Sequence, residues 1–171
     1  MAFFVPKDIE AILDELKDEN DRAVALVGAS LVEHTLQEAI RSVLRPFDDK
    51  DNAELKDRIF GNRGIFSGLS AKILGAFVLS IIGKQAQRDL ELINKIRNTF
   101  AHDMNPLDFS NAGIKSRCSE LQIRKNSLAV GNPRREYLLA VQMYSAALNL
   151  WSIRGLLPEG ERLEILDWLS A

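Results

Sequence analysis

The segment 97–102, which reads RNTFAH, brings together three side chains that could act on a phosphate. In a helix, Asn98 and His102 lie one turn apart on the same face, and Arg97 is the neighbour of Asn98. A histidine exchanges its proton near neutral pH, and an arginine can hold a phosphate through two parallel hydrogen bonds. Cleavage of RNA without a metal uses such a pair, with a base for the 2′-hydroxyl and a cation for the phosphate oxygens. We therefore consider Arg97, Asn98 and His102 candidate catalytic residues.

The same residues also have a structural interpretation. Glu33 is predicted to lie in the middle of an apolar helix, where a carboxylate needs a partner, and Arg97 could form a structural ion pair with it. Arg22 and Arg41 are other possible partners. Asn98 and His102 would then complete a helix end, where a protonated imidazole is favourable. A single histidine cannot be base and acid in one turnover without help, and two copies of the motif across a dimer interface would supply it.

A basic stretch follows later in the chain, between residues 114 and 136. It is the local candidate for binding an anionic partner, and its bases are Lys115, Arg117, Arg124, Lys125, Arg134 and Arg135. Residues 7–21 are strongly acidic by contrast. The alternative is therefore that the basic stretch pairs with this acidic segment, in the same chain or in a dimer mate.

Composition excludes several classes of protein. The 171 residues, 46% of them hydrophobic, fit one helical domain over 1–171, and the net charge of −2 gives no general attraction to nucleic acid. Cys118 is the single cysteine and there are two histidines, so we expect no disulfide, no metal site and no cofactor. No signal peptide is evident, and the most apolar run, 69–83, is too short to span a membrane. We expect a cytoplasmic protein.

Helical periodicity recurs along the whole chain, without strand alternation or repeats. The pattern predicts an all-α bundle of about six or seven helices. The most apolar helix, which ends near Ile82, is predicted to be the buried central one, starting after a cap at Ser67 or Ser70. The other helices are predicted over 6–19, 21–45, 84–102, 111–121 and 134–154, and the segments 53–60 and 158–169 are candidates for one further short helix each.

Three stretches resemble the mannitol operon repressor family. Residues 22–33 (RAVALVGASLVE) are similar to the first long helix of that family. Residues 64–73 (GIFSGLSAKI) are similar to its glycine-containing loop and central helix, and residues 89–102 (DLELINKIRNTFAH) to the helix that follows. The resemblance covers about residues 20–121, and we expect helices within 134–170 to pack on that core. It implies an all-helical transcription regulator without a DNA-binding module. Such a protein would act through a protein partner, such as a DNA-binding regulator or an antitoxin, and we expect a homodimer.

A broader resemblance concerns the motif itself. Arg97, a polar residue, a three-residue gap and His102 are similar to the motif of the HEPN helical domains. That resemblance implies a dimeric, metal-independent ribonuclease of a toxin or defence system, or an inactive relative that binds RNA. Our leading hypothesis is a non-enzymatic regulator that acts through a partner protein and does not read DNA itself. The alternative is an endoribonuclease that uses Arg97 and His102.

Overall fold

A computed structural model describes residues 7–44, 53–122 and 131–153 of the chain. Over these ranges it contains helices and no strand, which confirms the predicted all-α bundle. The predicted helix over 158–169 lies outside the described residues. The helices are α1 (Lys7–Glu15), α2 (Asp21–Val43), α3 (Ala53–Phe60), α4 (Leu69–Val78), α5 (Lys84–His102), α6 (Ala112–Glu120) and α7 (Pro133–Ser152).

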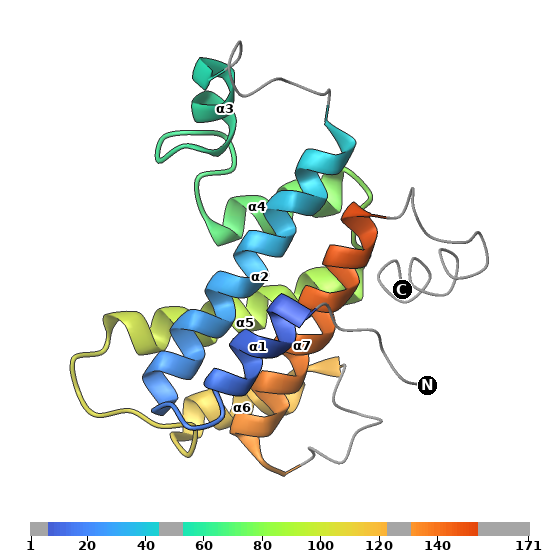
Figure 1. The fold of residues 1–171 in the computed structure, drawn as a ribbon. Helices are drawn as coiled ribbons and strands as arrows, with labels where there is room; N and C mark the ends of the chain where they lie inside the picture. The colour runs from blue at the N-terminus through green and yellow to red at the C-terminus, as the bar shows by residue number, and fades with distance from the viewer. Residues whose placement is uncertain (1–6, 45–52, 123–130, 154–171) are drawn as a thin grey trace.

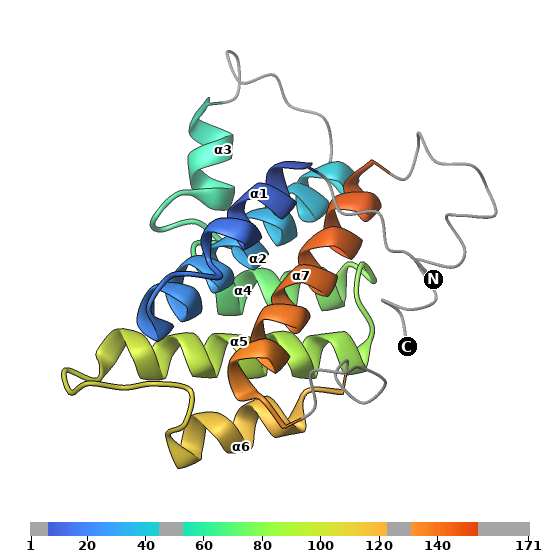
Figure 2. The same cartoon turned by 60° about the horizontal axis from the view of Figure 1, so that its bottom comes forward.

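Helices α2 and α7 lie side by side and form the main contact of the bundle, and α5 crosses them (Figures 1 and 2). A glycine in the middle of α2 allows this close approach. A Cβ on Gly28 would lie 3.1 Å from Cε1 of Tyr137 and 3.2 Å from Cγ2 of Val141 on α7. The Tyr137 hydroxyl donates a hydrogen bond to the carbonyl oxygen of Ala25 at 2.7 Å, which fixes the pairing of the two helices.

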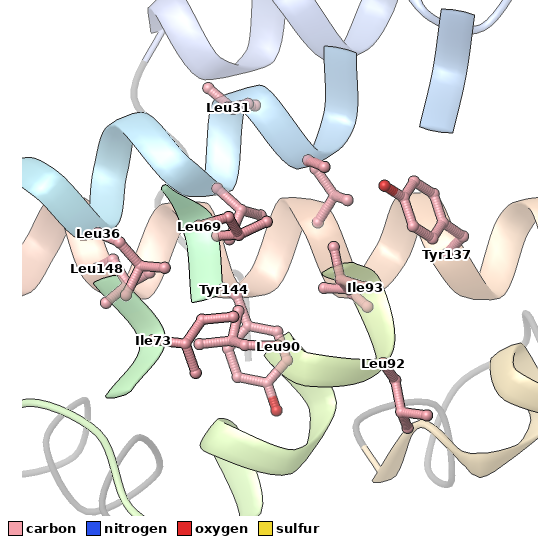
Figure 3. Packing of buried hydrophobic residues seen from close by; sticks show 14 of the residues in the cluster. Leu31, Leu36, Leu69, Ile73, Leu90, Leu92, Ile93, Tyr137, Tyr144 and Leu148 are labelled. Atoms are coloured by element: carbon pink, nitrogen blue, oxygen red, sulfur yellow. The ribbon is translucent and has the colours of Figure 1, made fainter. Parts of the chain in front are cut away.

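The core fills the space between α2, α4, α5 and α7. Figure 3 shows Leu36 and Leu148 between α2 and α7, and Ile73 of α4 beside Leu90 of α5. These four side chains are at most 1% exposed. Burial of each such side chain contributes about 1.5–3 kcal/mol, so this cluster fixes α5 relative to the other helices.

A fully buried carboxylate joins α5 to α7 and to the segment after α6. Asp89 accepts hydrogen bonds from the Tyr144 hydroxyl at 3.0 Å and from the backbone N–H of Gln122 at 3.0 and 3.1 Å. Burial and the neighbouring Asp89 charge raise the pKa of Tyr144 well above its ordinary value, so its hydroxyl stays protonated as a donor. The network therefore holds the first half of α5 in place.

Helix α4 is not the central helix that its composition predicts. It packs on α2 and α5 through one face and ends at Val78, and Gly83 is the N-cap of α5. Leu74 and Val78 on its other face are 57% and 71% exposed. Apolar residues on every side of a helix indicate that each side can be buried, but they do not specify that other elements of the same chain bury it.

Helix α3 stands away from the bundle in both views (Figures 1 and 2), and none of its residues is buried. The loop after it folds back, because the backbone N–H of Phe66 donates to the carbonyl of Ile59 at 2.8 Å. The Phe66 ring then lies directly over Gly75 of α4, where a Cβ would overlap the ring. Glycine at position 75 therefore lets the 61–68 loop lie against α4.

Candidate functional site

The last two turns of α5 carry the RNTFAH motif, and a buried stripe sets the rotation of this helix. Leu90, Ile93, Ile96 and Phe100 recur every three or four residues and are all fully buried. Residues between these positions must point sideways or outward. Arg97 and Asn98 are therefore half-buried at the margin of the core, and His102 is exposed as the last residue of the helix.

Within the motif, Nη1 of Arg97 donates a hydrogen bond to Oδ1 of Asn98 at 2.9 Å. Asn98 thus orients the arginine. Among the described residues, Arg97 has no carboxylate partner and the His102 side chain makes no hydrogen bond. The guanidinium thus keeps donors for another group, which anion binding needs. The imidazole is open to solvent, which proton transfer needs.

Arg22, the second residue of α2, caps the carboxyl end of α5. Its Nη1 donates to the carbonyl oxygens of Phe100 and of Asp103, the latter at 3.0 Å, and its Nη2 donates to the carbonyl of Asn105 at 2.9 Å. The last carbonyls of a helix have no partner within it, and a cation at that end is favourable. Arg22 thereby fixes the backbone on both sides of His102, and we call this contact the Arg22 cap.

The residues beside Arg22 join further elements at the same place. Asn20 is the N-cap of α2 and accepts a hydrogen bond from the backbone N–H of Ala23. One carboxylate oxygen of Asp21 accepts from the backbone N–H of Phe109 at 2.8 Å, and the other pairs with Arg134 of α7. The start of α2 is therefore connected to α5, to the α5–α6 segment and to α7.

The expected ion pair between Glu33 and Arg97 does not form, because Glu33 has a different partner. Nζ of Lys72 on α4 donates to Oε1 of Glu33 at 2.6 Å, with the side chains 5% and 32% exposed. Lys72 belongs to the buried stripe of α4 with Leu69, Ile73 and Ala76, so its ammonium cannot reach bulk water. This pair joins α2 to α4, and the arginines proposed as alternatives do not take its place.

The four described residues of the basic stretch differ in their contacts. Arg134 is engaged within the chain, where its Nη2 donates to the carbonyls of Leu16, Lys17 and Glu19 just after α1. For this residue the structure agrees with pairing to the acidic N-terminal segment. Arg117 donates to the Thr99 hydroxyl on α5 and to the Gly113 carbonyl, both at 3.4 Å. Lys115 and Arg135 are exposed, while Arg124 and Lys125 lie outside the described residues.

An exposed apolar surface lies over α4 and the loop before it. Of the nine exposed large hydrophobic residues in the described chain, five fall within residues 65–79. They are Ile65, Leu74, Phe77, Val78 and Leu79, which we call the α4 face. The helix itself carries one charged residue, Lys72, and that side chain points inward to Glu33. The α4 face thus lacks any charged group from its own helix.

Among the described residues, no group of three or more histidine, cysteine or acidic side chains is arranged to hold a metal ion. None of the seven helices combines the length and the hydropathy needed to cross a membrane.

Comparison with known proteins adds one finding on the fold. No family model and no curated protein matches the sequence. The X-ray structure of the MtlR–HPr complex from Escherichia coli does match, with a TM-score of 0.61 over 97% of this chain and 100% of that chain, at 17% identity. The fold is mannitol repressor-like. This confirms, at the level of the fold, the resemblance seen in residues 22–33, 64–73 and 89–102.

Within this mannitol repressor-like fold, the sequence analysis missed the contacts of two residues, Lys72 with Glu33 and Arg22 with the carboxyl end of α5. For Lys72 there was a signal, because Leu69, Lys72, Ile73 and Ala76 follow helical spacing and place the lysine in the buried stripe. Arg22 had no such signal, since an arginine in the first turn of a helix is usually solvent-exposed. Its acceptors lie 78 to 83 residues further along the chain.

Proposed function

We propose that this chain is a regulatory interaction protein that works by contacting other proteins and does not read DNA itself. The observation that carries the proposal is the α4 face. Contiguous apolar residues exposed on a small protein mark contact surfaces, and an uncharged surface of this kind suits a protein far better than a nucleic acid.

The charge distribution supports the same conclusion. The exposed side of α5 carries Lys84, Arg88 and Lys95, which could resemble a basic stripe. Glu91 lies in the same row, however, and Arg88 pairs with Glu120 of α6 at 3.4 Å. Within the described residues, the bases of α5 therefore do not form an uninterrupted positive stripe, and the net charge of −2 gives the chain no overall attraction to a duplex.

The solved neighbour suggests which kind of partner to test first. MtlR was crystallised as a complex with HPr, and we propose that the present chain also binds a partner protein, with HPr of the same organism as the first probe. As for the mannitol operon repressor, the consequence of binding would be regulation of transcription.

The test is titration of the purified chain with HPr by calorimetry, beside a gel-shift assay with the chain alone on duplex DNA. We expect saturable binding of HPr and no sequence-dependent shift of DNA at physiological salt. A sequence-dependent shift by the chain alone would contradict the proposal. So would the absence of any protein partner, whether HPr or a second copy of the chain.

A ribonuclease remains the second candidate, and the geometry of the motif favours keeping it. Arg97 donates to Asn98 and has no carboxylate partner among the described residues, and His102 is exposed on the same helix end. In this candidate Arg97 would hold the phosphate, His102 would transfer the proton, and a dimer mate would supply the second histidine.

Cleavage of a mixed RNA pool in the presence of a chelator separates the two candidates. If the second is correct, wild type cleaves, and the folded Arg97→Ala and His102→Ala variants lose at least about 100-fold in rate, the usual contribution of a general base. Lys95→Ala, on the exposed side of the same helix, is the matched control and should keep its activity. A wild-type protein that does not cleave RNA would rule out the ribonuclease, and the regulatory function would be the remaining candidate.

A further inference from the structure

From the charges around the α4 face we infer that this surface binds an acidic amphipathic helix of a partner protein. The inference rests on the proposed function, because it takes the α4 face as a surface for protein contact. It adds the chemistry of the segment that the surface accepts, which is an apolar ridge with carboxylates on its flanks.

The segment that carries the α4 face contains bases and no acid. Residues 58–88 include no aspartate or glutamate, and their bases are Arg58, Arg63, Lys72, Lys84 and Arg88. Two of these bases already have partners, since Lys72 pairs with Glu33 and Arg88 pairs with Glu120. The other three are exposed, and none of them forms an ion pair with another described residue.

The three exposed bases flank the α4 face along the chain. Arg63 lies two residues before Ile65, and the backbone N–H of Ile65 donates to the carbonyl oxygen of Arg58 at 3.1 Å. Lys84 lies five residues after Leu79, where α5 begins. We call Arg58, Arg63 and Lys84 the basic rim. A surface of this kind complements a segment that places carboxylates beside apolar side chains.

The apolar residues have the spacing of a contact between helices. Leu74, Phe77 and Val78 lie at positions i, i+3 and i+4 and form a ridge on the outer side of α4. The Phe66 ring covers Gly75, so the loop before α4 borders this ridge on one flank. Such a ridge accepts an amphipathic helix whose own apolar side chains recur every three or four residues.

Two other occupants fit the same surface less well. A second copy would bring identical bases together across a two-fold axis, and residues 58–88 offer no acid to pair with them. Attachment to an anionic bilayer usually takes a cluster of about four to eight bases, whereas the basic rim has three. An arginine, by contrast, binds a single carboxylate through two parallel hydrogen bonds, so the rim favours an acidic protein segment.

Fluorescence anisotropy with two labelled helical peptides, each longer than the ten residues of α4, tests the inference. Both peptides carry leucine at helical spacing on one side, and the flanking positions are glutamate in one peptide and lysine in the other. We expect the chain to bind the acidic peptide at least about 10-fold more tightly than the basic peptide. This preference should shrink as salt is raised, because the charges of the basic rim are exposed and screened.

Charge reversal on the basic rim provides the critical variant. In the double variant Arg58→Glu, Arg63→Glu the preference should invert, so that the basic peptide binds more tightly than the acidic one. Val78→Glu should weaken binding of the acidic peptide more than about 10-fold, because its carboxylate would be buried on the ridge without a partner. The control with the same change in net charge is Lys115→Glu, Arg135→Glu, which should keep the wild-type preference. All these positions are exposed, so the variants should fold, and circular dichroism checks this.

Several results would overturn the inference. Equal affinity for the two peptides would do so, as would no binding of the acidic peptide, or a preference that Arg58→Glu, Arg63→Glu leaves unchanged. A wild-type dimer that Val78→Glu dissociates in sedimentation velocity would place a second copy on the α4 face. Binding to phosphatidylcholine–phosphatidylserine vesicles that Val78→Glu abolishes would place a membrane there. If the acidic peptide does not bind but HPr does, the inference fails while the proposed function stands.

Discussion

Replacing Glu33 with glutamine should lower the free energy of unfolding by about 2–3 kcal/mol, and replacing its partner Lys72 with methionine should cost about 1 kcal/mol or less. The asymmetry follows from exposure. Without Glu33, the Lys72 ammonium is left without its carboxylate partner in a site where its side chain is 5% exposed. Without Lys72, the Glu33 carboxylate is 32% exposed and can regain water, while methionine fills the space of the lysine stem.

The double variant Glu33→Gln, Lys72→Met completes the cycle. It should be more stable than Glu33→Gln alone, because no uncompensated charge is left between α2 and α4. Urea unfolding followed by circular dichroism provides the values for all three variants. Glu38→Gln is the matched control on the same helix, since Glu38 forms a surface pair with Arg41 at 4.0 Å and should change stability by less than about 0.5 kcal/mol. A larger loss from Lys72→Met than from Glu33→Gln would show that the pair is not held as described.

The second large effect should come from Arg22. The change Arg22→Ala removes charged hydrogen bonds to three carbonyl oxygens at the end of α5, and we expect a loss of about 2–4 kcal/mol, since each such bond is worth about 1.5–3 kcal/mol and this one group is partly exposed. Arg22→Lys should recover less than half of this loss, because a single ammonium cannot reproduce the planar set of donors.

Hydrogen exchange identifies where that stability is lost. In Arg22→Ala the backbone amides of residues 100–109 should exchange faster than those of α2 and α7, because the Arg22 cap is the contact that ties this segment to α2. Arg135→Ala, which removes an exposed arginine from α7, serves as the control and should leave both stability and exchange near wild type. Uniformly faster exchange throughout the Arg22→Ala chain would instead indicate a purely global role for Arg22.

Local signals in the sequence were sufficient for the helices. The predicted ranges 53–60 and 84–102 coincide with α3 and α5. Caps, breakers and apolar spacing act over one or two turns, so a single sequence contains them. The all-α class followed directly, because no stretch alternates with the period of a strand.

Contacts between distant segments were not predictable in the same way. The sequence indicated that Glu33 needs a partner. Whether that partner is Lys72 or Arg97 depends on how α4 and α5 lie against α2, which the sequence alone does not specify. The outward side of α4 escaped prediction for a related reason. Leu74 and Val78 have the composition of a core, and whether they are covered within the protomer is a property of the whole bundle.

The contacts at residues 20–22 also constrain the order in which the protein can be completed during synthesis. Asp21 can form its contacts only after Phe109 and Arg134 have been synthesised, and Arg22 needs the carbonyl groups of residues 100–105. These partners lie 78 to 113 residues further along the chain. Helix α2 likewise has its main partner in α7, near the other end of the described chain. Contacts this distant in sequence slow folding relative to simple helical hairpins. On the ribosome the first half of the chain must therefore remain without its final packing until α7 has emerged. During that period only chaperones or rapid synthesis protect its apolar surfaces from aggregation.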